Sequence, residues 1–420
     1  MPKLSLRCVG CGTTYAPPAL HCTRCDGLLR SEYAVADFRP RKIEGLFAFH
    51  DWLPPAASID TPVGPQVYRS EKLSAQLGLH DLAIAFNGYA PAVGAKNPTG
   101  SFKDFEALPT VLYSRENGID ALILSSAGNT ARAFAHAATK LDYPVVLVVP
   151  ERAVPRLWLP CRPSAAVRLI VIEGNDDYAF AIQASGLISR TLDIAPEGGA
   201  RNVARRDGMS TAILEYARCF RALPAHYIQA IGSGTGAIAV WEGAQRLIAA
   251  GVGTMLPALH LAQNTPFTPI HDAWTTGSPI DPKADIERQL AQIAQIDALV
   301  LANRTPPFAI PGGVRDALAA SNGQTYAVSN PAARAAAKLF LDTEGLAIGP
   351  AAAVATAALA HAVRAGRIAA DDSVLLHITG NNEHLIRRDF TLHPIEPVLK
   401  LRPHEVSEIA IRRLRDVILP

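Results

Sequence analysis

The sequence predicts an α/β protein whose parallel sheets are covered by helices on both faces. From about residue 66 onward, short apolar segments typical of buried strands alternate with alanine- and leucine-rich segments typical of helices. Two glycine-rich turns, at 125–130 and 232–236, each lie between such a strand and such a helix. The chain has 420 residues, so it can bury more than one hydrophobic core.

Residues 1–35 predict a zinc-ribbon-like segment of short strands. Four of the six cysteines form two C-x2-C pairs, Cys8 with Cys11 and Cys22 with Cys25. This spacing is typical of tetrahedral coordination of Zn²⁺ by four thiolates, which leaves no open position for water. We therefore expect a structural zinc. Two disulfides, which a cytosolic chain disfavours, and a reduced quartet without metal are the alternatives.

The rest of the chain predicts strands and helices in alternation, after a proline-rich, irregular stretch at 51–65. The predicted strands are 82–86, 121–124, 144–149, 169–172, 227–231, 258–263 and 373–379. The predicted helices are 102–117, 131–141, 176–190, 237–245, 332–342 and 351–365.

Lys103 follows a turn that contains proline and glycine, in the segment 97–104 with the sequence NPTGSFKD. Only nine of the 40 basic residues are lysines, so a lysine here is not a routine surface choice. A partly buried lysine can lose its proton and attack an aldehyde, whereas arginine stays protonated at neutral pH. A solvated lysine at a helix start is the alternative.

The two glycine-rich turns are candidate anion sites. The turn at 125–130 (SSAGNT) begins a predicted helix, and its small hydroxyl residues and free backbone N–H groups suit a carboxylate. The turn at 232–236 (GSGTG) lets the backbone approach a phosphate closely. Either turn alone is common in α/β proteins. The second turn lacks both the Walker lysine and the dinucleotide-binding spacing.

In this order, the lysine and the two turns resemble the tryptophan-synthase-β-like (fold type II) pyridoxal-phosphate enzymes. The segment around Lys103 is similar to the Schiff-base motif of the threonine synthase family, whereas the wider chain is more similar to the cysteate synthase family. The similar segments are 49–54, 126–136, 155–160, 196–209, 232–242 and 389–397. The resemblance implies two doubly wound parallel-sheet domains with the cofactor between them. We expect the large domain at 36–110 and 213–420, and the small domain at 111–212.

The resemblance also implies the cofactor and the roles of individual residues. Lys103 would bind pyridoxal 5′-phosphate covalently and later remove the substrate α-proton. Asn129 would contact the cofactor's phenolic oxygen and Thr379 its pyridine nitrogen. The cofactor phosphate would be bound by Gly232, Ser233, Gly234, Thr235 and Gly236. Ser126 and Thr130 would hold the substrate carboxylate. Asn202 and Arg205 would face the active site, where an arginine suits the substrate phosphate. A helix cap at Asn129, a satisfied strand threonine at Thr379 and a solvated Arg205 are the structural alternatives.

The function that the resemblance implies is β-replacement on O-phospho-L-serine through an aminoacrylate intermediate, with sulfite as the nucleophile and phosphate released. The loop 97–100 (NPTG) is the threonine synthase version, so conversion of O-phospho-L-homoserine and water to threonine is the alternative. An alternative of another class is a zinc-ribbon interaction module on a non-catalytic scaffold.

Composition argues against nucleic-acid and membrane partners. The net charge is +2, and no basic run or aromatic–basic interleaving is present. No apolar stretch reaches the ~20 residues of a membrane span, and the first residues contain no signal-peptide core, so we expect a cytoplasmic protein. The expected partners are a phosphorylated amino acid, a small nucleophile and a second copy of the chain in a homodimer.

Overall fold

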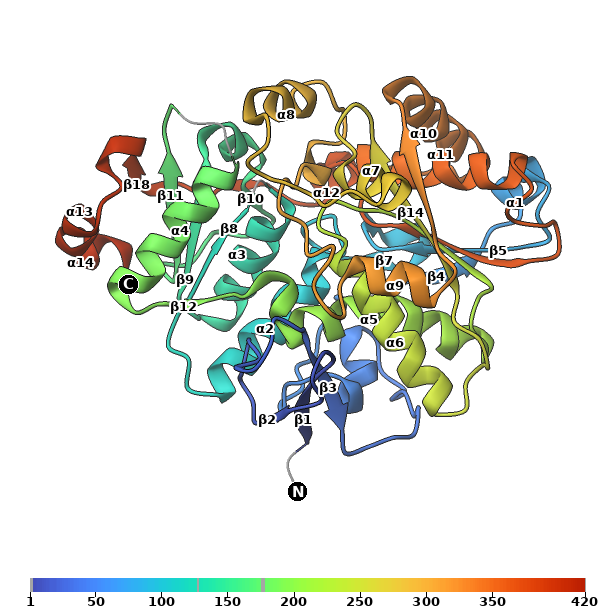
Figure 1. Cartoon of the computed structure of the whole chain (residues 1–420), viewed down its shortest axis with the longest axis horizontal. Coiled ribbons are helices and arrows are strands. Elements are labelled where there is room, and N and C mark those ends of the chain that lie inside the picture. Colours follow the sequence, from blue (N-terminus) through green and yellow to red (C-terminus); the bar gives the residue numbers. More distant parts are fainter. Residues whose placement is uncertain (1–2, 127, 175–177, 420) are drawn as a thin grey trace.

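The computed structural model describes residues 3–126, 128–174 and 178–419 (Figure 1). Two helix-covered sheets stand side by side, and a small N-terminal sheet lies beneath α5 and α6 at the bottom of the view. The predicted α/β class is therefore confirmed. No helix within the described ranges is long and apolar enough to cross a membrane.

The larger sheet has six strands in the order β15-β14-β13-β16-β5-β4. Its strands are β4 (Val67–Arg69), β5 (Asp81–Phe86), β13 (His226–Ala230), β14 (Ala258–Asn264), β15 (Gln324–Val328) and β16 (Ser373–Ile378). All neighbours are parallel except β4, which runs antiparallel to β5 at the edge. The four predicted strands in this sheet agree with the structure to within one residue, because each is a long buried apolar run.

Helices cover both faces of this sheet because successive strand residues point to opposite sides. In β16, Leu375 packs with one layer of helices and Leu376 with the other, and neither is exposed. The first layer contains α5 (Val203–Phe220), α6 (Thr235–Ala249) and α9 (Val314–Ala320). The second contains α1 (Lys72–Leu77), α10 (Asn330–Glu344) and α11 (Pro350–Arg364). The connection from β14 to β15 also carries α7 (Pro269–Thr276) and α8 (Ile286–Ile293).

The smaller sheet has five parallel strands in the order β12-β8-β9-β11-β18. They are β8 (Leu122–Ser125), β9 (Val145–Pro150), β11 (Val167–Ile172), β12 (Ala195–Pro196) and β18 (Pro397–Leu401). Two helices, α2 (Lys103–Glu116) and α3 (Asn129–Leu141), share a core with one face. On the other face lie α4 (Tyr178–Leu192), α13 (Glu408–Arg413) and α14 (Arg415–Ile418). The predicted helix start at residue 176 lies outside the described residues, as does residue 127.

The last part of the chain corrects one predicted boundary. We expected 213–420 to lie wholly in the large domain, but β18 pairs with β11 in the smaller sheet. The helices that follow β18 contribute Ile411 and Ile418, both with no exposed surface, to the core around α4. In Figure 1 these red C-terminal helices lie beside α4. The five residues of β18 form too short a pattern to indicate which sheet they join.

The N-terminal segment is an antiparallel sheet of β1 (Leu4–Cys8), β2 (Thr14–Tyr15) and β3 (Leu29–Tyr33), with β1 in the centre. It is fastened to α5, where the hydroxyls of Ser31 and Tyr33 donate to Asp207 at 2.6 and 2.7 Å. The shorter elements are β6 (Tyr89–Ala90), β7 (Ala95–Lys96), β10 (Trp158–Leu159), β17 (His393–Pro394) and α12 (His384–Asp389).

Candidate active site

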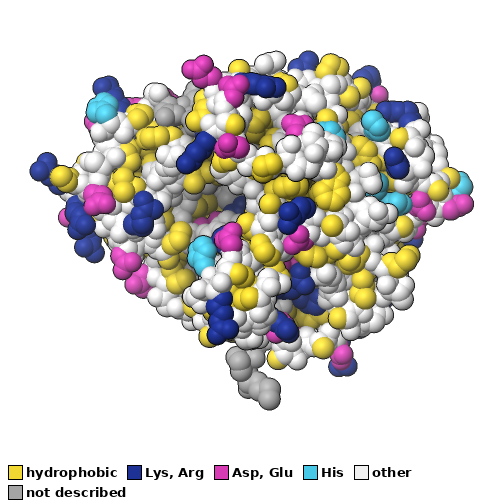
Figure 2. Space-filling model, viewed as in Figure 1, with side chains coloured by type: hydrophobic (Ala, Val, Ile, Leu, Met, Phe, Trp, Pro, Cys, Tyr) yellow, Lys and Arg dark blue, Asp and Glu magenta, His cyan; other side chains and the backbone are white. Residues whose placement is uncertain are grey.

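A cavity of about 860 Å³ lies between the two sheets, at the carboxyl ends of their strands. The space-filling view shows the surface hollowed between the two halves of the molecule (Figure 2). Both glycine-rich turns line this cavity, and so do Lys103 and Thr379. The structure therefore brings together residues that the sequence separates by more than half of the chain.

A tight turn fixes the position of Lys103. Gly100 has a φ of 74°, in the left-handed region that favours glycine. Ser101 forms an isolated antiparallel bridge with Gly380, which follows β16. A Cβ added at Gly380 would lie 2.7 Å from the carbonyl oxygen of Gly100, so the two turns approach as closely as only glycine allows. Lys103 then begins α2 at the cavity wall.

The amino group of Lys103 lies in a nearly enclosed position, and its side chain is 17% exposed. Its Nζ lies 3.2 Å from Oε2 of Glu106, one turn further along α2, and 4.7 Å from the centre of the Phe102 ring. Burial lowers the pKa of Lys103 below its ordinary value, and the Glu106 carboxylate opposes this shift. A lowered pKa increases the share of uncharged amine, which is the nucleophilic form.

The turn 232–236 joins β13 to the N-terminus of α6. Gly234 has a φ of 77°, and an added Cβ there would lie 2.4 Å from Cγ2 of Val314. The N-cap residue of α6 is Gly234, which has no side chain, and Ser233 Oγ accepts from the backbone N–H of Thr235 at 3.3 Å. The hydroxyls of Ser233 and Thr235 lie 2.9 Å apart beside the first turn. The N-terminus of a 15-residue helix, with its backbone N–H groups and two hydroxyls, suits a phosphate.

The turn 125–130 joins β8 to the N-terminus of α3. The Ser126 hydroxyl oxygen accepts hydrogen bonds from the backbone N–H groups of Gly128 and Ala131, each at 3.1 Å. The Asn129 side-chain oxygen accepts from Arg132 at 2.7 Å, which directs the oxygen toward the protein. Asn129 and Thr130 both line the cavity. This second helix N-terminus at the same cavity suits a carboxylate.

Thr379 follows the last residue of β16 and is 8% exposed at the cavity wall. Its carbonyl oxygen accepts a hydrogen bond from the backbone N–H of Phe102 at 3.0 Å. The hydroxyl of Thr379 and the turn that carries Lys103 are thereby held on the same side of the cavity.

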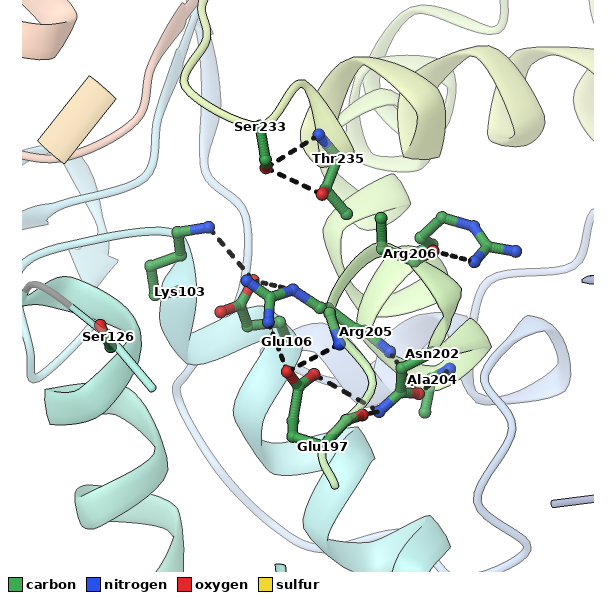
Figure 3. Close-up of polar contacts among 12 residues, drawn as sticks. Lys103, Glu106, Ser126, Glu197, Asn202, Ala204, Arg205, Arg206, Ser233 and Thr235 are labelled. Carbon is green, nitrogen blue, oxygen red and sulfur yellow. Dashed lines mark hydrogen bonds and ion pairs between the residues drawn. The ribbon is translucent and has the colours of Figure 1, made fainter. Parts of the chain in front are cut away.

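Arg205 and Asn202 make close contacts with other protein groups, and Arg205 also lines the cavity (Figure 3). The Arg205 guanidinium lies between two carboxylates, 3.1 Å from Glu106 and 2.7 Å from Glu197. Burial disfavours its charge, but the two carboxylates raise its pKa above the ordinary value. Asn202 is the N-cap of α5: its oxygen accepts from Ala204 and Arg205 N–H groups, and its Nδ2 donates to the Glu197 carbonyl. Both polar atoms of the Asn202 side chain therefore bond to backbone groups of the protein, and its contact with the substrate stays a prediction.

Sequence reasoning missed three charged residues at this site. Glu106 lies three residues after Lys103 on α2, so helix spacing could have identified it. Arg132 lies three residues after Asn129 on α3 in the same way. Glu197 follows the two-residue strand β12, and no local pattern identifies it. Among the described residues, the cavity lining includes four basic side chains (Lys103, Arg132, Arg201, Arg205) and two acidic ones (Glu197, Glu383).

The four paired cysteines of the N-terminal segment converge. Their ligand atoms all lie within 4.8 Å of one another, with Sγ–Sγ distances of 3.4 Å (Cys8 to Cys25), 3.5 Å (Cys11 to Cys22) and 3.8 Å (Cys22 to Cys25). Zn–S bonds of about 2.3 Å in a tetrahedron place the sulfurs about 3.8 Å apart. The quartet therefore fits a Zn²⁺ ion.

Comparison with known proteins identifies the class. Residues 95–380 match the model of the pyridoxal-phosphate dependent enzyme family, and this region contains Lys103, both glycine-rich turns and Thr379. The chain therefore belongs to the pyridoxal-phosphate-dependent enzymes.

The curated relatives narrow this class. The chain is 46% identical to the cysteate synthase of Methanoregula boonei, over 97% of this chain and 96% of the relative. It is 43% identical to that of Methanosarcina acetivorans, over 97% and 98%. The chain thus belongs to the cysteate synthase family within that class.

Solved structures agree with the fold. A pyridoxal 5′-phosphate-dependent aspartate racemase has a TM-score of 0.59 at 16% identity, covering 76% of this chain and 90% of that one. Diaminopropionate ammonia lyase from Escherichia coli has a TM-score of 0.58 at 15% identity, covering 84% and 94%. At such low identity these structures support the fold alone.

Proposed function

We propose that this enzyme catalyses β-replacement on O-phospho-L-serine, with sulfite as the nucleophile and phosphate as the leaving group. The observation that carries the proposal is the placement of Lys103 in one cavity with two helix N-termini that suit anions. An amino acid with a carboxylate, held beside a phosphorylated cofactor, needs two such anion sites. The identity to cysteate synthases over nearly the whole chain supports the same substrate class.

The residues present fit pyridoxal 5′-phosphate. Lys103 would hold its aldehyde carbon, the turn 232–236 its phosphate, Asn129 its phenolic oxygen and Thr379 its ring nitrogen. When bound, this cofactor withdraws electrons from the substrate α-carbon. Thr379 would be a neutral partner for the ring nitrogen, which would leave that nitrogen unprotonated and favour loss of a β leaving group.

The protein's own groups would then move one proton and hold two anions. Ser126, Thr130 and the N-terminus of α3 would bind the substrate carboxylate. The Lys103 amine would take the proton from Cα, the Cβ–O bond would break, and phosphate would leave with the bonding electron pair. The sulfur of sulfite would form a bond to Cβ, and Lys103 would return the proton to Cα.

The substrate phosphate needs a cation near Cβ. Arg205 was predicted for this task, but two carboxylates already balance its charge. Arg132 also lines the cavity; Asp104 and Glu383 lie near enough to favour its charge, but neither forms an ion pair with it within the described part of the chain. Its guanidinium stacks 4.3 Å from the centre of the Trp158 ring. We therefore favour Arg132 as the group that binds the substrate phosphate.

Threonine synthase is the second candidate because of the NPTG loop. In the structure, Asn97 and Thr99 are completely buried. Asn97 accepts from the backbone N–H of Gly64, and Thr99 donates to Asp104. These contacts shape the turn before Lys103, so the structural role of Asn97 and Thr99 can account for the NPTG sequence without reference to the substrate. We therefore give the loop less weight in choosing the substrate than the similarity over the whole chain.

Steady-state kinetics with the purified enzyme can decide between the two substrates. We expect phosphoserine plus sulfite to yield cysteate with a higher kcat/KM than phosphohomoserine plus water yields threonine. One methylene is worth only about 1–3 kcal/mol in binding, so the larger part of the difference must come from chemistry. Phosphohomoserine needs a second proton abstraction, at Cβ, before its γ-phosphate leaves. A much higher kcat/KM for threonine formation would replace this proposal with the threonine synthase reaction.

The proposal extends to the metal, the compartment and the oligomeric state of the enzyme. The cysteine quartet would hold one structural Zn²⁺, because four thiolates leave no position for a substrate. The enzyme would work in the cytoplasm, where thiols stay reduced. It would form a homodimer, which analytical ultracentrifugation can test.

A further inference from the structure

The reactive amine belongs to a buried network of four charged side chains, those of Lys103, Glu106, Arg205 and Glu197. Glu106 is the central member: its Oε2 atom lies 3.2 Å from Nζ of Lys103 and 3.1 Å from Nε of Arg205. Arg205 continues to Glu197 at 2.7 Å. The Glu106 side chain has no exposed surface, and its Oε1 atom has no hydrogen-bond partner among the described residues. Figure 3 shows the carboxylate between the lysine and the arginine.

This arrangement is more than a structural ion pair. A buried carboxylate is costly, and the protein places this one against the single atom that must react with the cofactor. Arg205 carries one positive charge, which could neutralise only one carboxylate. Its guanidinium contacts Glu106 and also donates to Glu197. Counting unit charges, Arg205, Glu106 and Glu197 sum to −1 when all are ionised. The network is therefore balanced only when Lys103 carries a proton.

We infer that Glu106 is a positioning residue that stabilises the protonated form of Lys103, with Arg205 holding the Glu106 carboxylate in place. The inference rests on the proposed function in one respect, namely that Lys103 is the lysine that binds the cofactor. It adds a role that concerns this chain's own residues. When Lys103 takes the α-proton it becomes an ammonium, and the carboxylate 3.2 Å away stabilises that product of the proton transfer.

The groups that face Lys103 come from four elements. Glu106 lies on α2, Arg205 on α5, Glu197 after β12 and His377 on β16. Glu106 and Glu197 favour the ammonium form, and Arg205 disfavours it. Burial lowers the pKa of His377 to about 3, so this residue adds no charge near neutral pH. Glu106 is the member that contacts Nζ, and its replacement should have the largest effect.

The test follows adduct formation between the full-length protein and added pyridoxal 5′-phosphate as a function of pH. Borohydride fixes the adduct, and mass mapping counts it on Lys103. We expect Glu106→Gln to move the midpoint of the pH profile down by about 1–3 pH units, because an opposite charge at this distance shifts a pKa by that much. Glu106→Asp, which keeps the charge but shortens the side chain, should give a smaller shift. Glu287→Gln, on exposed α8, is the matched control and should leave the profile unchanged.

Replacing Glu106 by Gln should change the rate of adduct formation and the kcat for β-replacement in opposite directions. Near neutral pH the Glu106→Gln protein should form the adduct faster, because more of its lysine is uncharged. The same protein should have a kcat for β-replacement that is lower by about tenfold or more, because a weaker base removes the α-proton. A merely structural role would slow both steps together.

The outcomes separate this inference from the proposed function. A folded Glu106→Gln protein with an unchanged midpoint overturns the inference, whatever its activity. A shifted midpoint in an enzyme that does not turn over phosphoserine supports the role of Glu106 and refutes the proposed substrate. Adduct on another lysine refutes both. If Glu106→Gln does not fold, Glu106→Met decides, because it also removes the charge, and an unchanged midpoint in that variant overturns the inference.

Discussion

The backbone N–H of Phe102 donates to the carbonyl oxygen of Thr379 at 3.0 Å. This hydrogen bond joins the turn before α2 to the end of β16. It therefore sets the distance between the amine expected to hold the cofactor's aldehyde carbon and the hydroxyl expected to face its ring nitrogen. The adjacent contact between Gly100 and Gly380 involves only backbone atoms, so neither turn can shift without the other.

The contact between these turns predicts that Gly380→Ala damages the site. An added Cβ would lie 2.7 Å from the Gly100 carbonyl oxygen and 3.1 Å from the Ser101 Cβ, and overpacking of this kind costs about 1–3 kcal/mol. We expect weaker cofactor binding in a fluorescence titration. Gly366→Ala is the control, because a residue at φ 65° with no atom within 4 Å should lose stability through backbone strain alone. Equal cofactor affinity in the two variants would contradict the expected coupling.

Lys103→Ala should abolish the covalent adduct with pyridoxal phosphate. Wild-type protein should be yellow and keep its colour on dialysis, and borohydride should bleach it. Loss of the general base should lower turnover by at least about 10²–10⁴-fold. Lys338→Ala, at an exposed position of α10 paired with Asp342, should keep both colour and activity. A mass-mapped adduct on a lysine other than 103 would refute the assignment.

Local patterns were enough to predict the elements around the cavity. The turns at 125–130 and 232–236 each join a predicted strand to a predicted helix, Lys103 lies at the start of another predicted helix, and the carboxyl ends of parallel strands meet at one edge. Their convergence in one cavity therefore follows from parallel topology. Thr379 lines the cavity for the same reason, since it directly follows β16, and its contact with the cofactor stays a prediction.

Long-range partners could not be predicted in this way. Nothing near Arg205 in the sequence indicates that its guanidinium meets Glu106, almost one hundred positions earlier, instead of solvent. Local sequence did not indicate that Asn202 is the N-cap of α5, a role that asparagine fills well, and its contact with the substrate stays a prediction. The strand β18 joins the smaller sheet through contacts with β11 that no local periodicity encodes.

The cysteine quartet predicts about one zinc per chain in metal analysis. Cys11→Ser removes one thiolate, so it should release the metal and lower the Tm. The turnover of the enzyme that remains folded should change little, because none of the four sulfurs lines the cavity. Cys219→Ser, an exposed cysteine outside the segment, should keep both zinc and Tm. Complete loss of activity in a folded, cofactor-loaded Cys11→Ser protein would contradict a purely structural role.

Asp104 predicts a pH dependence of stability. Burial raises the pKa of its carboxyl to about 7, although the Thr99 N–H opposes the shift. The unfolded chain has a pKa of about 3.9, so the folded state binds more protons between about pH 4 and 7. The unfolding free energy should therefore fall as pH rises through this window and level off above it. Between about pH 4 and 7 the unfolding free energy of wild type should fall by up to about 4 kcal/mol more than that of Asp104→Asn.

Denaturant unfolding of both proteins at the two ends of the window measures this difference. Asp371→Asn is the control, since its side chain is 91% exposed and its replacement should leave the pH dependence as in wild type. An equal difference between wild type and Asp104→Asn at both pH values would show that the buried carboxyl titrates normally.

The last prediction concerns which arginine binds the substrate phosphate. Arg205 shares its charge with Glu106 and Glu197, so a phosphate there would meet two carboxylates at close range. Arg132 donates only to the oxygens of Asn129 and the Arg156 backbone, and its Nε has no partner in the described part of the chain. Burial lowers its pKa to about 10, and an arriving phosphate would offset that cost. Arg132 is thus the better anion receptor.

We therefore expect Arg132→Gln to raise the KM for phosphoserine by about tenfold or more, the loss of one charge-assisted hydrogen-bonding partner being worth about 1.5–3 kcal/mol. Competitive inhibition of this variant by inorganic phosphate should be weaker by a similar factor, while the colour of the bound cofactor persists. Arg205→Gln should act differently: by releasing Glu106 and Glu197 it should change kcat and stability more than KM. If instead Arg205→Gln raises KM and weakens phosphate inhibition while Arg132→Gln does neither, Arg205 binds the phosphate and its two carboxylates must move aside when substrate arrives.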